Sequence, residues 1–107
     1  MQLVRTRTFE KSLKKLGASE VDIALLEEEI AANPQAGDVI PGLGGARKVR
    51  FAMKGKGKRG GRRAIYLVIV LKDVAYLLLA YGKSEKEDLT SDERRMLAGV
   101  IEDLQNG

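Results

Sequence analysis

Two adjacent apolar runs constrain the fold of this 107-residue chain more than any other feature of its sequence. Arg62 to Leu71 is rich in Ile, Val and Tyr, and Val74 to Tyr81 is almost as apolar. Such runs predict β-strands, and the Lys72-Asp73 pair between them predicts a turn. Strands this apolar need cover on much of both faces, so other elements must pack against them.

Two helices are predicted ahead of these strands. From Thr8 to Gly17, apolar residues recur at intervals of four and three, which is the spacing of one helical face. Ser19 then begins a second helix with a capping box. Asn33-Pro34 ends that helix, because proline disfavours helical geometry in the preceding residue. The short connection predicts an αα-hairpin that covers one face of the sheet.

The remaining elements complete an α+β arrangement. Gln2 to Arg5 predicts a short edge strand, Arg47 to Met53 a further main strand, and Ser91 to Leu104 a terminal amphipathic helix. We therefore expect one domain over residues 1–107, in which a small antiparallel β-sheet packs against an N-terminal helical hairpin with a C-terminal helix.

A block of positive charge dominates the electrostatics of the chain. Arg47 to Arg63 holds nine of the nineteen Lys and Arg residues and no Asp or Glu. The formal charge of +4 comes from this block, since the rest of the chain has ten bases against fifteen acids. A block of this kind usually has an anionic partner, and a polyphosphate backbone is the first candidate; a solvated basic loop is the alternative.

The residue types that are missing exclude several classes of enzyme. The chain has no His and no Cys, which removes Ser-His and Cys-His nucleophilic sites and the usual zinc and iron sites. We therefore expect no metal and no cofactor. There is no apolar run of membrane-spanning length and no signal-peptide pattern at the N-terminus, so we expect a cytoplasmic protein without membrane contact.

Cationic and tyrosine side chains converge on the predicted sheet. Lys48 and Arg50 alternate with apolar residues on one strand, so the two bases share a face. Together with groups on the neighbouring strands they predict a surface for RNA, although each tyrosine is equally compatible with a core position. The expected binding residues are Arg47, Lys54, Lys56, Lys58, Arg59, Arg62, Tyr66 and Tyr81, around Lys48, Arg50, Arg63, Lys83 and Lys86.

The segment IPGLGGARKVRFAMKGKGKRGGRRAIYLVIV, followed by YLLLAYGKSEKEDLTSDE, resembles the HigB-type branch of the RelE superfamily, the toxins of type II toxin–antitoxin systems. The resemblance covers nearly the whole chain and rests on a combination of motifs: GGxRKxRF, GKGKRGG, RxIY and YxKxxKxDLT. It implies a RelE-like fold and a metal-independent mRNA interferase, which cuts mRNA in the ribosomal A site by 2′-hydroxyl attack. It also implies a cognate antitoxin, a helix-turn-helix protein.

The same resemblance implies roles for individual residues. Lys48 and Arg50 would grip the message, and Arg63 would stabilise the charge that builds up on the phosphate. Lys83 and Lys86 occupy positions where the family places further positively charged catalytic groups. Two positions depart from RelE, which has an arginine where Ser84 aligns and a tyrosine near Thr90. The sequence therefore does not decide which lysine is the general acid and which is the general base.

Three other functions are compatible with the same residues, and the simplest is a structural protein or subunit with a basic, tail-like loop. A non-catalytic module that binds RNA or the ribosome explains the charge equally well. ParE-type gyrase inhibitors share the fold and lack ribonuclease activity, although the RKxR and YxKxxK residues argue against that branch.

Overall fold

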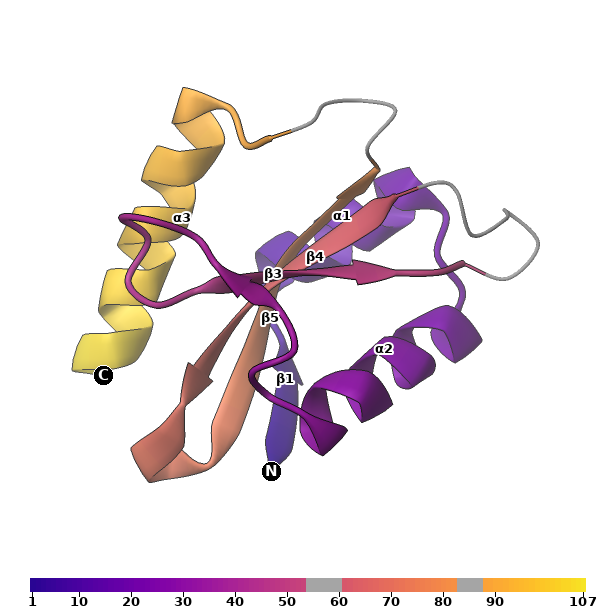
Figure 1. Cartoon of the computed structure of the whole chain (residues 1–107). Helices are drawn as coiled ribbons and strands as arrows, with labels where there is room; N and C mark the ends of the chain where they lie inside the picture. Colours follow the sequence, from indigo (N-terminus) through magenta and orange to yellow (C-terminus); the bar gives the residue numbers. More distant parts are fainter. Residues whose placement is uncertain (54–60, 83–87) are drawn as a thin grey trace.

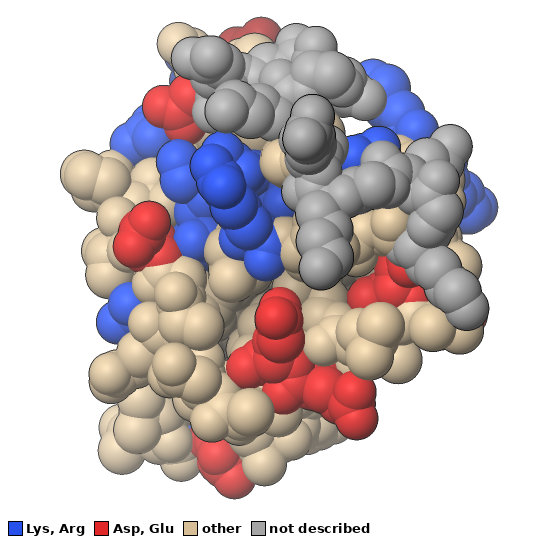
Figure 2. Space-filling view, turned by 45° about the vertical axis from the view of Figure 1, so that its right-hand side comes forward, with Lys and Arg blue, Asp and Glu red and all other residues tan. Residues whose placement is uncertain are grey.

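The computed structural model describes residues 1–53, 61–82 and 88–107; the residues between these ranges are grey in Figure 1 and Figure 2. Within the described residues, five strands form one sheet in the order β1-β5-β4-β3-β2. The strands are β1 (Gln2–Arg5), β2 (Asp38–Val39), β3 (Arg47–Phe51), β4 (Arg62–Ile69) and β5 (Val74–Gly82). The helices are α1 (Arg7–Leu16), α2 (Glu20–Ala32) and α3 (Ser91–Asn106). The predicted α+β architecture is confirmed (Figure 1).

The sheet is mixed, which corrects the expectation of an antiparallel one. β1 is an edge strand, as predicted, but it runs parallel to β5, with Gln2 opposite Val74 and Arg5 opposite Leu77. Parallel neighbours need a long connection, and the chain between β1 and β5, which includes α1, α2 and the other three strands, supplies it. The short strand β2, which pairs with β3 at the other edge, was not predicted.

Side chains pack on both faces of the central strands β4 and β5. We call the face under α1 and α2 the helix-pair face and the opposite one the α3 face. On the helix-pair face the buried residues include Phe9, Leu13, Ile23, Leu26, Ile30, Phe51, Tyr66 and Leu77. On the α3 face they include Ile40, Leu43, Ile65, Leu67, Leu78, Leu79, Tyr81, Leu97 and Ile101. The terminal helix therefore belongs to the core.

A β-bulge in β5 interrupts the strict alternation of the two faces. Ile65 of β4 is opposite Leu79, but the next residue, Tyr66, is opposite Leu77. Leu78 is therefore an extra residue, and it points to the same face as Leu79. Beyond the bulge, Tyr81 faces α3 rather than the helix pair.

The helix ends follow the predicted capping patterns. In α2 the Asp22 backbone N–H donates to the Ser19 hydroxyl at 3.1 Å, and the Ser19 N–H donates back to the Asp22 carboxylate at 3.0 Å. Thr90 and Glu93 form the same reciprocal pair at α3. Gly17 ends α1 with φ of +77°, a conformation that glycine adopts without steric cost.

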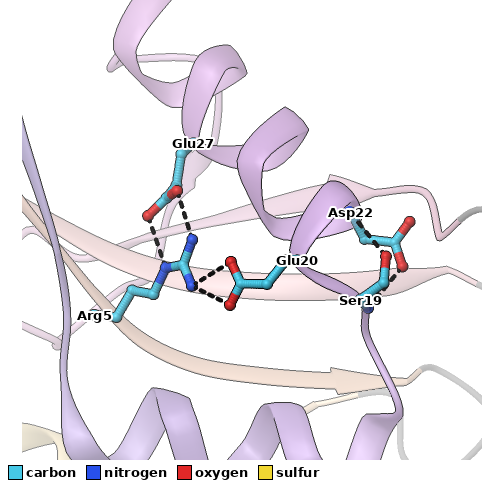
Figure 3. Close-up of polar contacts among 5 residues, drawn as sticks. All are labelled: Arg5, Ser19, Glu20, Asp22 and Glu27. Carbon is cyan, nitrogen blue, oxygen red and sulfur yellow. Dashed lines mark hydrogen bonds and ion pairs between the residues drawn. The ribbon is translucent and has the colours of Figure 1, made fainter.

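An arginine clamp joins the edge strand β1 to α2 (Figure 3). The Arg5 guanidinium donates to both carboxylate oxygens of Glu27, at 3.0 and 2.9 Å, and to both of Glu20, at 2.9 and 3.0 Å. The hydrogen bonds to Glu27 raise the pKa of Arg5 above its ordinary value, against the opposite effect of burial. The side chains of Arg5 and Glu27 are 22% and 20% exposed, while Glu20 is 82% exposed.

Arg5→Met, which keeps the aliphatic stem, is expected to lower the free energy of unfolding by about 1–3 kcal/mol, because it leaves Glu27 partly buried without its partner. Glu20→Gln should cost less than about 1 kcal/mol, since an exposed carboxylate gains little from an ion pair. Urea denaturation of the two variants measures both effects. Equal decreases in the free energy of unfolding would contradict the claim that Glu27 is the more important partner of Arg5.

Candidate nucleic-acid interface

A row of three side chains crosses the central strands on the α3 face. Arg50 of β3 is paired with Arg63 of β4, and Arg63 is paired with Tyr81 of β5. Directly opposed residues in antiparallel strands point to the same face, with Cβ atoms about 4.5–5.5 Å apart. Two arginines in this arrangement repel each other, and an anion bound between them relieves the repulsion.

β3 separates its basic side chains from its apolar ones, as the alternation predicts. Phe51 is 8% exposed and Met53, just after the strand, is 3% exposed; both pack on the helix-pair face. Arg50 is exposed and Lys48 is half-buried on the opposite face, where Lys48 is paired with Ile65. The structure therefore brings Lys48, Arg50 and Arg63 together.

These bases line a surface groove beside the short edge strand β2. The groove is formed by Ala36, Asp38, Lys48, Val49, Arg50 and Arg63. Figure 2 shows Lys and Arg side chains gathered on one face of the molecule. A groove with three cations fits a phosphodiester backbone better than a neutral ligand.

Asp38 is a groove residue that the sequence analysis did not identify. It lies on β2 directly opposite Lys48, so both side chains point into the groove from one face. A two-residue strand carries no alternating pattern, and nothing in the sequence around Asp38 indicated that it pairs with β3.

A backbone carbonyl two residues earlier in the chain orients the Arg63 side chain. One guanidinium N–H of Arg63 donates to the carbonyl oxygen of Gly61 at 3.2 Å. The other guanidinium donors have no protein acceptor among the described residues and are available for a phosphate. Guanidinium groups bind phosphate through two parallel hydrogen bonds, which fixes the position of the anion as well as its charge.

Tyr81 is the buried end of this row. Its side chain is 3% exposed, so the ring does not offer a face for base stacking. Burial raises the pKa of Tyr81 above its ordinary value; Asp88 and Glu93 raise it further, and Arg63 lowers it. The phenol is therefore coupled electrostatically to the arginine beside it.

This coupling predicts that Arg63→Ala raises the pKa of Tyr81 further, because the substitution removes the positive charge that stabilises the tyrosinate. Tyrosinate absorbance measured against pH should show one residue titrating later in the variant. Tyr81→Phe in both backgrounds identifies that residue. An unchanged titration in Arg63→Ala would place the guanidinium away from the phenol.

Three predicted binding residues lie on the other face. Tyr66 is fully buried, and its hydroxyl donates to the Pro34 carbonyl at 2.7 Å and accepts from the Gly37 N–H at 3.0 Å. Arg47 is opposite Tyr66 and donates to the Gly37 carbonyl at 2.8 Å. Arg62 is opposite Phe51. Tyr66 and Tyr81 are therefore both core residues and not surfaces for base stacking. Arg47 and Tyr66 hold the chain segment that precedes β2.

The remaining predicted site residues lie outside the described residues. They are Lys54, Lys56, Lys58, Arg59, Lys83 and Lys86.

A family comparison identifies the kind of protein that carries this site. Residues 1–106 match the family model described as the RelE toxin of the RelE / RelB toxin–antitoxin system. The chain belongs to the RelE toxin family. The match spans both sides of the groove, so the Lys48, Arg50 and Arg63 cluster is part of a RelE-family domain.

Solved structures of RelE share the fold. The E. coli RelBE toxin–antitoxin complex contains a chain that is 23% identical, with a TM-score of 0.52, over 74% of this chain and 92% of that one. A free-state E. coli RelE variant with two arginines replaced by alanine is 18% identical, also with a TM-score of 0.52, over 80% of this chain and 86% of that one. The RelE-like fold is thus confirmed.

Two features are absent from the part of this RelE-family chain that the structure describes. Among residues 1–53, 61–82 and 88–107, no three His, Cys, Asp or Glu side chains are grouped so that they hold a metal ion. No helix in these ranges is long and apolar enough to cross a membrane.

Proposed function

We propose that this RelE-family protein is a ribosome-dependent mRNA endoribonuclease of the HigB type, a toxin that inhibits translation. The observation that carries the proposal is the opposed pair Arg50 and Arg63, with Lys48 on the same face, in a groove of a RelE-family chain. A phosphodiester in the A-site codon binds to this cluster. The protein acts in the cytoplasm, where translation takes place.

The reaction is an intramolecular transesterification that needs neither metal nor cofactor. The ribose 2′-oxygen attacks the adjacent phosphorus, the O2′–P bond forms and the P–O5′ bond breaks. Arg50 and Arg63 neutralise the phosphorane-like oxygens, and preorganised positive charge of this kind is often the largest catalytic contribution. A lysine, Lys48 or Lys86, takes the proton of the attacking 2′-hydroxyl, and a lysine of this pair gives a proton to the departing 5′-oxygen. The family resemblance assigns a catalytic role to Lys83 as well.

The protein partner is an antitoxin with a helix-turn-helix DNA-binding fold. The E. coli relative was solved as an intact RelBE toxin–antitoxin complex, which supports an antitoxin for this chain as well. In the absence of the antitoxin the toxin is active.

Induced expression of the protein without its antitoxin is expected to stop growth, with protein synthesis falling before DNA synthesis. Pulse-labelling of both syntheses after induction measures the order. Normal growth at confirmed soluble expression would refute the toxin assignment. An earlier fall in DNA synthesis would instead support a ParE-like gyrase inhibitor, and arrested translation with intact messages would support a non-catalytic ribosome-binding module.

A further inference from the structure

A carboxylate lies in the groove that is proposed to bind phosphate, and it is not one of the proposed phosphate contacts. Asp38 is exposed and lines the groove with Lys48, Arg50 and Arg63. An ionised carboxylate accepts hydrogen bonds and donates none, so it repels phosphate and lowers the affinity of the groove for a bare polyanion. A role for Asp38 in binding must therefore involve a hydrogen-bond donor on the ligand.

The side chain of Asp38 is available to such a donor. Although Asp38 is directly opposite Lys48, it forms no ion pair within 4.0 Å and no side-chain hydrogen bond with any residue that the structure describes. Register places its Cβ about 4.5–5.5 Å from that of Lys48, and about 7–8 Å from that of Arg50, the diagonal neighbour. A nucleotide whose phosphate lies on Arg50 and Arg63 thus has its sugar within reach of Asp38.

The backbone that carries Asp38 is held firmly against β3. The Tyr66 hydroxyl bridges Pro34 and Gly37, and Arg47 donates to the Gly37 carbonyl. A Cβ atom at Gly37 would lie 2.8 Å from the Lys48 carbonyl oxygen, so only glycine allows this approach. The hydrogen bonds of Arg47 and of the buried Tyr66 therefore fix the position of Asp38 on the groove.

We propose that Asp38 accepts a hydrogen bond from the ribose 2′-hydroxyl of the nucleotide bound at Arg50 and Arg63, and so makes the groove select RNA over DNA. The 2′-hydroxyl is the donor that every ribonucleotide presents next to its phosphate, whatever its base. The same hydrogen bond holds the 2′-oxygen beside the phosphorus that it attacks. This inference rests on the proposed function.

Binding to programmed ribosomes tests the pairing between the residue and the hydroxyl. All arms keep Arg50 and Arg63 and use messages in which a methylene group replaces the bridging 5′-oxygen at the scissile position, so that messages remain intact; they compare an A-site codon carrying 2′-hydroxyls with one carrying 2′-deoxyribose. With Asp38 present, the ribose message is expected to bind about tenfold more tightly or better, the effect of one hydrogen bond to a charged group. With Asp38→Ala, the two messages should bind within about twofold of each other.

A matched control separates this pairing from the loss of a negative charge. Asp103→Ala removes an exposed carboxylate of α3 that does not line the groove, and it should keep the preference for ribose. A preference that survives Asp38→Ala overturns the inference. Cleavage of the unmodified message by the wild-type protein on programmed ribosomes is measured in parallel: if it fails, the proposed function fails, whereas cleavage without the Asp38 dependence refutes only the role of Asp38.

Discussion

Arg63→Ala is expected to lower the rate of the proposed message cleavage on programmed ribosomes by about 10²–10³-fold, the usual effect of removing one donor that stabilises developing charge. Arg63 lies between Arg50 and Tyr81 in the row that crosses the sheet. Its loss leaves a single arginine against the phosphorane-like oxygens. Single-turnover cleavage at saturating toxin measures the change in rate, and Arg50→Ala should cause a loss of similar size.

The fold should tolerate these substitutions, because Arg50 is exposed and the Arg63 side chain makes a single hydrogen bond to the described residues, to the Gly61 carbonyl. Phe51→Ala, next to Arg50 but on the buried face, should instead lower the free energy of unfolding by about 3–5 kcal/mol. Arg95→Ala is the matched control, since this arginine is 80% exposed on α3, and its cleavage rate should change by less than about twofold. If Arg63→Ala unfolds the protein, the arginine is structural and the site assignment fails.

Local patterns in the sequence predicted most of the elements, because each depends on contacts within a few residues. Ser19 with Asp22, and Thr90 with Glu93, form capping boxes that are complete within four residues. The alternation of Lys48, Val49, Arg50 and Phe51 separates the exposed bases from the buried side chains in the same way. Features of this kind can be predicted without knowing which strand lies alongside.

Features that depend on register between distant segments were not predicted. The parallel pairing of β1 with β5 joins residues about seventy positions apart, and the bulge at Leu78 reverses the face of Tyr81. Tyr66 was a candidate for base stacking because tyrosine suits both surfaces and cores. Its place in the core follows from Pro34 and Gly37, which lie far from it in the sequence.

The groove was therefore predicted in part. Lys48, Arg50 and Arg63 share a face because strand alternation and strand pairing agree. Asp38 was missed because only the pairing of β2 with β3 brings it there.

Dependence on the ribosome is the second large effect that we expect. The chain has no His, so no side chain has an ordinary pKa near neutrality with which to take up and return a proton. The described part of the groove is an open surface that would hold the proposed RNA through charge, and charge alone does not align a 2′-oxygen with its phosphorus. Orientation supplies about 7–11 kcal/mol of a reaction barrier, and a ribosomal site that fixes the message provides it.

Mapping cleavage of one message, free in solution and on programmed ribosomes, tests the central claim most directly. We expect the purified protein to leave the free message nearly intact and to cut the ribosome-bound message within the A-site codon. The upstream fragment should end in a 2′,3′-cyclic phosphate, which 2′-oxygen attack requires. Rapid cutting of the free message at the same sites would contradict the dependence on the ribosome, and an intact message on the ribosome would contradict the endoribonuclease assignment itself.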